Sequence, residues 1–165
     1  MISKTEKNLS DAFAGEAQTN RKYFAFALKA EQEGFKQVAK LFRAAAEAEA
    51  IHAFNHFKAL GSIKGTKENL EAAFEGETNA FQIKYPQMIE DAKAEDHKLA
   101  LISLTFANET EKGHATLYKK ALESLGSDRD IEYHVCSMCG HTVKGEPPEI
   151  CPICKAKKDS YKKID

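Results

Sequence analysis

The feature that most restricts how this chain can fold is an internal repeat in its first 125 residues. Gly15-Glu16 recurs as Gly76-Glu77, 61 residues later. Glu49-x-x-His52 recurs as Glu111-x-x-His114, 62 residues later. Each copy carries Gly-Glu first and Glu-x-x-His second, so the sequence predicts two copies of one structural unit.

The repeated region is expected to be helical throughout. Apolar side chains recur at spacings of four and seven, for example at Phe13, Ala17 and Phe24, which is typical of an amphipathic helix. Glycines and a turn near Asp96 divide the region into four helices, at roughly 4–33, 36–60, 67–94 and 97–124. Short connections favour an all-α four-helix bundle, with the link at 61–66 joining two helix pairs.

The repeated glutamates and histidines are typical of a metal site in the core of a bundle. Residues three apart share one face of a helix, so Glu-x-x-His offers a carboxylate and an imidazole to one ion. Two such pairs, each with one further Glu, form a two-metal carboxylate site. The four carboxylates would balance two divalent ions, as a low-dielectric interior requires. The expected ligands are Glu16, Glu49, His52, Glu77, Glu111 and His114.

The alternative is that these pairs are ordinary surface contacts. A single Glu-x-x-His pair is most often exposed and contributes roughly 0.2–0.5 kcal/mol. Two pairs, each preceded by Gly-Glu at matching spacing, favour the metal site instead. Gly15 and Gly76 need a reason of their own, because glycine inside a helix costs about 1 kcal/mol relative to alanine. We expect both to permit a close approach of helices beside the ligands.

The four cysteines predict a second metal site. Cys136 and Cys139 form one C-x₂-C pair, and Cys151 and Cys154 form another after eleven intervening residues. Each pair turns two thiolates toward one ion, and a tetrahedral sulfur site suits zinc or a single iron. Taken alone, the cysteines favour structural zinc over iron, and disulfides are the third possibility.

Composition divides the chain into two domains. Residues 1–126 contain no cysteine and one of the four prolines, whereas all four cysteines and the other three prolines follow. The segment from Gly126 to Asp130 is typical of a helix end and a linker. We therefore expect one domain at 1–126 and a second at 131–165.

The bulk properties exclude two classes of partner. A formal net charge of −1 predicts no general attraction to nucleic acid or to membranes. No apolar stretch approaches the length of a membrane span, and the first seven residues do not resemble a secretory signal. We expect a cytoplasmic protein whose thiols stay reduced.

With these motifs in place, the chain resembles the rubrerythrin family, in which a ferritin-like bundle precedes a small C-terminal rubredoxin-like metal-knuckle domain. The resemblance runs from the first Gly-Glu to the last cysteine pair. It also includes Arg21-Lys22-Tyr23, Tyr85-Pro86 and Tyr133-His134-Val135-Cys136.

The resemblance implies a non-haem peroxidase, of the NADH peroxidase type, that reduces hydrogen peroxide to water. It implies two irons at the carboxylate and histidine ligands. A third iron at the cysteines would relay electrons, which reverses the preference for zinc. Tyr23 and Tyr85 stand where the family has hydrogen-bond partners of the carboxylates, with core packing as the alternative. The implied partners are rubredoxin or a flavin reductase as electron donor, and further copies of the chain in a homodimer or higher homo-oligomer.

Two residues depart from the family pattern. Ala80 stands where the family usually has a further ligand, in Gly-Glu-x-x-Glu. With no carboxylate there, we expect His52 to stay bound in both oxidation states or water to fill the position. Lys155 follows the last cysteine, where the family usually has glycine. That position often needs a positive φ, so we expect a strained turn or altered hydrogen bonding to the sulfurs.

Two further functions stay open at the level of sequence. Ferroxidase activity with oxygen predicts no advantage for peroxide as oxidant. A non-enzymatic iron-binding or zinc-stabilised scaffold predicts a colourless protein with zinc at the cysteines. The missing glutamate favours both more than a complete motif would.

Among the other histidines, His56 is expected on a solvated face and His97 at the surface. His134 and His141 are expected to be bystanders of the cysteines.

Overall fold

The computed structural model describes residues 2–127 and 130–165. It divides into two compact units, Met1–Lys64 and Gly65–Asp165. The division falls inside the link at 61–66 that was predicted to join two helix pairs, so each unit contains one copy of the repeat. Asp128 and Arg129, which belong to the predicted linker, lie outside the described residues.

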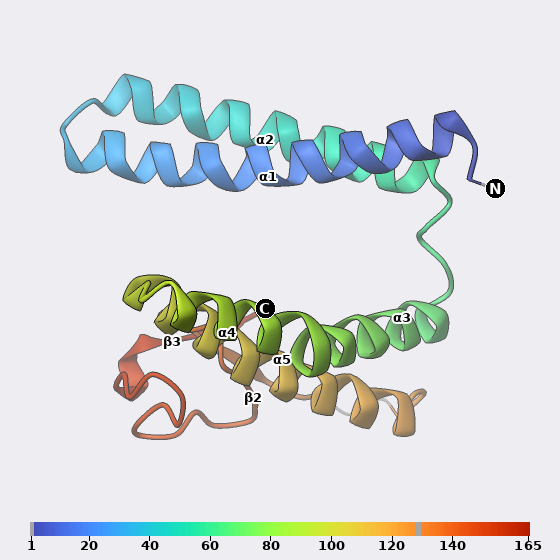
Figure 1. Cartoon of the computed structure of the whole chain (residues 1–165), viewed down its shortest axis with the longest axis vertical. Coiled ribbons are helices and arrows are strands. Elements are labelled where there is room, and N and C mark those ends of the chain that lie inside the picture. The colour runs from blue at the N-terminus through green and yellow to red at the C-terminus, as the bar shows by residue number, and fades with distance from the viewer. Residues whose placement is uncertain (1, 128–129) are drawn as a thin grey trace. The chain divides into compact units, whose positions relative to one another are not determined.

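The first unit is an antiparallel helix pair, α1 (Lys4–Gln32) and α2 (Lys36–Ala59) (Figure 1). A capping box starts α1, because Ser3 Oγ accepts from the Glu6 N–H while the Glu6 carboxylate accepts from the Ser3 N–H. Gly34, with a φ of 85°, makes the turn between the helices. Alanines form the buried seam of the pair, and their small side chains let the two backbones lie close together: Ala27, Ala30, Ala39, Ala46 and Ala53.

The second unit begins with three consecutive helical segments that pack on a fourth. These are α3 (Thr66–Asn79), the π-helical turn η1 (Ala80–Lys84), α4 (Tyr85–Ala94) and α5 (Lys98–Glu123). The single helix predicted at 67–94 is therefore wrong in detail. Pro86 has no N–H to donate and its ring crowds the carbonyl of the preceding turn. The chain widens there, and the Tyr85 N–H bonds to the Ala80 carbonyl, five residues back.

The second unit ends in a small β module, which consists of β1 (Tyr133–Cys136), β2 (Thr142–Lys144), the 3₁₀ turn η2 (Lys158–Ser160) and β3 (Tyr161–Ile164). The strands form an antiparallel sheet in the order β2-β1-β3. In this register Val135 pairs with Thr142 and Cys136 pairs with Tyr161. The sheet thus places the first cysteine beside Tyr161.

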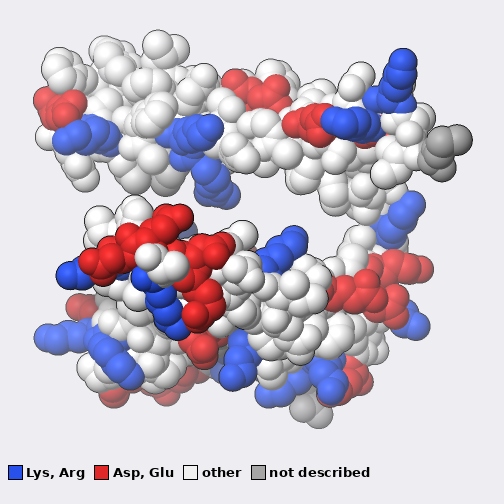
Figure 2. Space-filling view, viewed as in Figure 1, with Lys and Arg blue, Asp and Glu red and all other residues white. Residues whose placement is uncertain are grey.

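On the face shown in Figure 2, basic and acidic side chains are mixed on each unit, and neither sign covers a whole face (Figure 2). This agrees with the formal net charge of −1. None of the described helices combines the length and the apolarity that crossing a membrane requires.

Candidate metal centres

The first cluster of predicted ligands lies in the helix pair of unit one. Glu16 comes from α1, and Glu49 and His52 come from α2, with their ligand atoms within 4.8 Å of one another. His52 Nδ1 lies 3.1 Å from Glu49 Oε2. A hydrogen bond shared with Glu49, together with burial and the charge of Glu49, raises the pKa of Glu16.

The second cluster has the same composition and lies in unit two. Glu77 comes from α3, and Glu111 and His114 come from α5, again with ligand atoms within 4.8 Å of one another. His114 Nδ1 lies 2.8 Å from Glu111 Oε2 and 3.7 Å from Glu77 Oε1. Burial raises the pKa of Glu77, and the nearby Glu111 carboxylate raises it further.

Both triads suit a hard divalent metal ion. Each places two carboxylates of like charge and one imidazole around a common point, and a proton or a cation must offset the repulsion between the carboxylates. Oxygen-rich sites with an imidazole suit iron, manganese and related ions. The structure thus brings the six predicted ligands together as two sets of three, one in each unit.

The two predicted tyrosines have different surroundings. The pKa of Tyr85 is raised by burial and by the charges of Glu111 and Glu77, so its hydroxyl lies near the second triad. Tyr23 packs among aromatic rings, with ring centres 6.2 Å from Phe26 and 6.0 Å from Phe42.

The glycines beside the ligands do not have the expected role. A Cβ added to Gly15 or to Gly76 would have no atom within 4 Å beyond its own helix backbone. The close helix approach predicted there is therefore wrong for the packing inside each unit.

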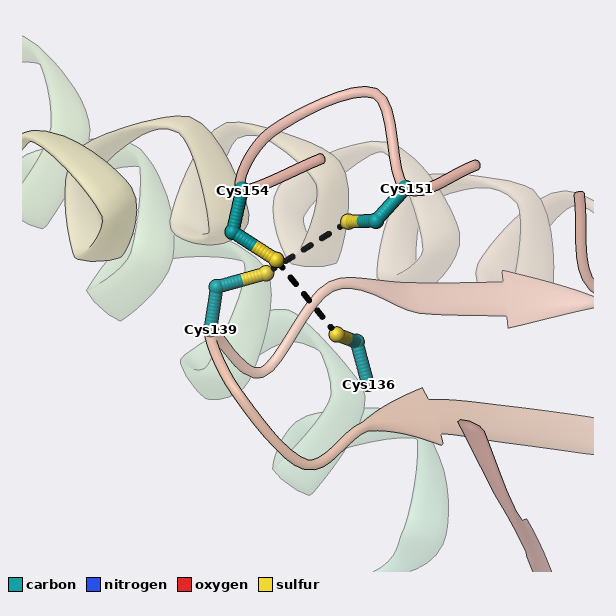
Figure 3. Close-up of side chains that lie close together, drawn as sticks. All are labelled: Cys136, Cys139, Cys151 and Cys154. Atoms are coloured by element: carbon teal, nitrogen blue, oxygen red, sulfur yellow. Dashed lines mark hydrogen bonds between the residues drawn. The ribbon is translucent and has the colours of Figure 1, made fainter. Parts of the chain in front are cut away.

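The four cysteines converge on one point in the β module (Figure 3). Cys136 Sγ lies 3.7 Å from Cys154 Sγ, and Cys139 Sγ lies 3.6 Å from Cys151 Sγ. Metal–sulfur bonds of about 2.3 Å at tetrahedral angles imply sulfur–sulfur distances of about 3.8 Å. All four thiols are free, so the disulfide alternative is not found, and the geometry fits one tetrathiolate ion.

The electrostatics of the cysteines also favour a bound cation. Burial opposes ionisation of Cys151, but hydrogen bonds from Tyr161 and from the amides of Cys154 and Ile153 lower its pKa to about 6. Burial raises the pKa of Cys139 and of Cys154. The Cys151 thiolate thus forms readily, whereas Cys139 and Cys154 need a metal ion to replace their protons.

Several residues around these sites were not found from the sequence. Tyr161 bonds to Cys151 and to His141, whose Nδ1 lies 2.6 Å from the Tyr161 hydroxyl. His141, expected to be a bystander, therefore joins a hydrogen-bonded chain to a cysteine. Thr110 and Thr142 connect α5 to the β module. No motif marks a threonine, so only their three-dimensional contacts reveal them.

The two departures from the family pattern have clear positions. Lys155 has a φ of 64°, so the residue after the last cysteine adopts the left-handed conformation that favours glycine. Its Nζ donates to the Pro152 carbonyl at 2.9 Å. Ala80 is the first residue of η1, three residues after Glu77.

The remaining histidines have local partners. His97 is the N-cap of α5, where its Nδ1 accepts from the Ala100 N–H at 3.2 Å. His134 Nδ1 lies 2.9 Å from the Gly145 carbonyl. His56 lies close enough to Glu16 that its charge lowers the pKa of that carboxyl against the larger raising effects.

A helical protein with two carboxylate–histidine triads and a C-terminal tetrathiolate module belongs to a recognisable class of metal-binding proteins. A family model described as rubrerythrin matches residues 7–122, more than half of the chain. A second, described as the rubrerythrin rubredoxin-like domain, matches residues 134–162.

Similar proteins agree with these matches. Rubrerythrin-2 of Clostridium acetobutylicum is 33% identical, over 93% of this chain and 92% of the relative. Nigerythrin of Nitratidesulfovibrio vulgaris is 33% identical, over 97% of this chain and 86% of the relative. A solved structure of fully reduced, all-ferrous nigerythrin is 31% identical with a TM-score of 0.61, covering 99% of this chain and 88% of that one.

The chain belongs to the rubrerythrin family, with a C-terminal rubredoxin-like domain, and is similar to nigerythrin. Its fold class is a four-helix bundle followed by a small three-stranded rubredoxin-like domain. The family and the metal-binding character predicted from the sequence are confirmed.

Proposed function

We propose that this protein is a non-haem di-iron peroxidase that reduces hydrogen peroxide to water. The observation that carries the proposal is the presence, in one chain, of two equivalent Glu-Glu-His triads and a tetrathiolate site. The family to which the chain belongs supports the same activity. The proposal assigns two irons to the triads together and one iron to the four cysteines.

The ligands suit these ions for different reasons. Carboxylate oxygens and imidazole hold ions that bind an oxygen-containing substrate, and sulfur ligands hold an ion that only exchanges electrons. Iron at the triads would supply two electrons and polarise the peroxide oxygens. Iron at Cys136, Cys139, Cys151 and Cys154 would carry one electron at a time.

The reaction also consumes protons, and two protonatable side chains, Glu77 and Tyr85, lie at the second triad. Reduction of hydrogen peroxide by two electrons consumes two protons and yields two waters. Burial raises the pKa of Glu77 in the metal-free chain, so an iron ion bound at Glu77 would take the place of a proton there. The Tyr85 hydroxyl, beside Glu77 and Glu111, keeps its proton because its pKa is also raised. We assign Tyr85 to hydrogen bonding at this carboxylate pair, and Tyr23 to the corresponding position in the first unit.

The proposal also includes the partners implied by the family. Rubredoxin or a flavin reductase would deliver electrons to the rubredoxin-like domain, giving NADH peroxidase-type activity. A homodimer or higher homo-oligomer would be the working form.

Anaerobic purification with metal analysis and visible spectroscopy tests this proposal. We expect about three irons per chain and sulfur-to-iron charge-transfer bands. Dithionite should bleach the bands, and peroxide should restore them faster than oxygen does. Glu111→Gln should keep the coloured tetrathiolate iron but lose fast reoxidation by peroxide. Glu109→Gln, an exposed neighbour on α5, is the matched control.

Two results would contradict the proposal in different ways. Zinc at the cysteines of protein from its native source would remove the electron relay. Rapid oxygen consumption with no advantage for peroxide would favour ferroxidase activity, for which Ala80 in place of a ligand glutamate is the supporting observation.

A further inference from the structure

A hydrogen-bonded connection joins the β module to the second triad inside unit two. Thr142, the first residue of β2, places its Oγ1 2.9 Å from His114 Nε2. The same Oγ1 lies 3.0 Å from the Gly140 carbonyl. Gly140 directly follows the ligand Cys139. A side chain of the β module, three residues after Cys139, therefore contacts the imidazole that faces Glu77 and Glu111.

The number of hydrogens on each group determines which of them donates in the Thr142–His114 hydrogen bond. A threonine hydroxyl has a single hydrogen and two lone pairs. A carbonyl oxygen only accepts, so the Thr142 hydroxyl donates to the Gly140 carbonyl. Its lone pair is then free to accept, and the group that faces it is His114 Nε2. The imidazole therefore carries a hydrogen on Nε2 and donates it to Thr142 Oγ1.

The consequence appears on the other side of the ring. With the hydrogen on Nε2, a neutral imidazole keeps its lone pair on Nδ1. Nδ1 is the atom that lies 2.8 Å from Glu111 Oε2 and 3.7 Å from Glu77 Oε1. Two acceptors this close need a hydrogen or a cation between them, so when a metal ion displaces that hydrogen the ring presents Nδ1, its one ligating atom, to the point where the two carboxylates converge.

A second contact fixes the module on the same helix. Thr110, which is only 4% exposed, donates from Oγ1 to the Cys139 carbonyl at 3.0 Å. A Cβ on Gly140, whose φ is 82°, would lie 3.5 Å from Thr110 Cγ2. Two neighbouring carbonyls of the knuckle, those of Cys139 and Gly140, therefore accept hydrogen bonds from threonines, one on α5 and one on β2.

We propose that Thr142 is a positioning residue that holds His114 in the Nε2–H tautomer, so that its Nδ1 faces Glu77 and Glu111 as a metal ligand. Through this residue the tetrathiolate knuckle of a chain orients a metal ligand of the same chain. The inference rests on the proposed function, because it takes the second triad to be a metal site. Hydrogen bonding to the far nitrogen of a ligating histidine commonly affects metal affinity by about 10- to 100-fold.

Metal binding to two variants tests the proposal. Thr142→Val keeps the size of the side chain and removes the hydroxyl, whereas Thr142→Ser keeps the hydroxyl. The full chain is first loaded with one zinc ion at the cysteines, and Zn²⁺ binding beyond that ion is measured by competition with a chelator. We expect Thr142→Val to weaken the triad by about 10-fold or more, and Thr142→Ser to retain most of the parent's affinity.

Two matched variants separate this role from a general effect on structure. Thr116→Val removes an exposed hydroxyl on α5 that bonds only to the Lys112 carbonyl among the described contacts, and it should bind zinc as the parent does. Thr110→Val removes the other contact to the knuckle but leaves the His114–Thr142 pair. It should therefore weaken the triad less than Thr142→Val.

The tautomer itself is measured by ¹⁵N NMR of histidine in the zinc-loaded protein, since zinc is diamagnetic. We expect a protonated Nε2 and a metal-bound Nδ1 for His114 in the parent and in Thr142→Ser. In Thr142→Val the Nε2 proton should shift and exchange faster with water. Equal affinity and an unchanged Nε2 signal in Thr142→Val would overturn the inference. A parent chain that binds no zinc beyond the cysteine site would instead overturn the proposed function.

Discussion

Lys155 shows how a single residue can carry a conformational cost beside a metal site. Its φ of 64° is a conformation that costs an L-residue with a Cβ about 1–2 kcal/mol. The position was identified from the sequence, because glycine is usual there in the family. Glu77 carries a different cost, since burial and the neighbouring Glu111 carboxylate both oppose its charge. Both costs predict measurable effects of substitution.

Replacing Lys155 with glycine should stabilise the β module by about 0.5–1 kcal/mol. Relief of the left-handed strain exceeds the greater freedom of glycine in the unfolded chain, which is worth about 0.4–1 kcal/mol. Hydrogen exchange of the Cys136 amide, which bonds to the His141 carbonyl at 2.9 Å, measures the effect in metal-loaded protein.

The matched control is Asp96→Gly, at the other described non-glycine residue with positive φ, 50°. Asp tolerates this conformation better than Lys does, and the turn lies outside the module. Asp96→Gly should therefore leave the Cys136 amide unchanged. Faster exchange in Lys155→Gly than in the parent would contradict the strain argument.

In metal-free protein, Glu77 should make stability fall as the pH rises. Its folded pKa is raised above the ordinary value of 4.5, so the folded state binds the proton more tightly than the unfolded state. The stabilisation is present below pH 4.5 and is lost as the pH rises through the folded pKa. Thermal unfolding in chelator at pH 5 and pH 7, followed by circular dichroism, should show this loss.

Glu77→Gln removes the titrating group, so its melting temperature in chelator should depend less on pH between these two values. Glu75→Gln, at an exposed position of α3, should keep the slope of the parent. Identical slopes for Glu77→Gln and the parent would contradict a raised pKa of Glu77 in the folded, metal-free chain.

At the scale of elements, the π-helical turn η1 is the feature that distinguishes the third predicted helix from the one observed. It begins at Ala80, where the family usually has a ligand, and ends just before Tyr85. Short π-helical turns occur often at functional sites because they change the direction of side chains within a helix. The turn is present here although its first residue has no ligating atom.

Ala80→Glu should lower the reduction potential of the iron-loaded triads. A carboxylate added at this position brings a negative charge that stabilises the more oxidised, more highly charged state. Redox titration of anaerobically loaded protein measures the shift. Gln82→Glu adds the same charge at an exposed position of η1 and should change the potential less. Equal potentials for Ala80→Glu and the parent would count against a ligand role for position 80.

At the scale of the whole molecule, the helices and the β module are stabilised differently. The β module has strands of four, three and four residues. Among the described side chains, the largest that are fully buried are Cys136 and Cys151. A module of this kind has almost no apolar core, so the metal ion supplies most of its folding free energy.

Removal of the tetrathiolate metal should therefore unfold the module while the helices persist. Chelation under reducing conditions should abolish hydrogen-exchange protection of the β1 amides and retain most of the helical circular dichroism. The contact between Thr142 and His114 should be lost in the same step. Retained protection of the β1 amides after complete metal removal would show that the sheet is stable by itself.

Much of the fold and of the candidate metal sites can be predicted from the sequence alone. Helix periodicity and glycine positions predict the helices, because the pattern of side chains along a helix depends on local geometry. The motifs Glu-x-x-His and C-x₂-C predict the ligands, because their spacing places two donors on one side of a turn. The left-handed residue at Lys155 also has a local cause and was expected.

Only the tertiary structure shows that Thr142 lies against His114 and Thr110 against Cys139, or that His141 and Tyr161 form a chain to Cys151. The two threonine contacts join residues 28 and 29 positions apart in sequence. His141 and Tyr161 are 20 positions apart, and Tyr161 and Cys151 are 10 apart. Their proximity depends on how the sheet packs on α5 and on the register of its strands. Local residue pattern determines which groups can bind a metal, whereas long-range packing decides which hydrogen bonds orient them.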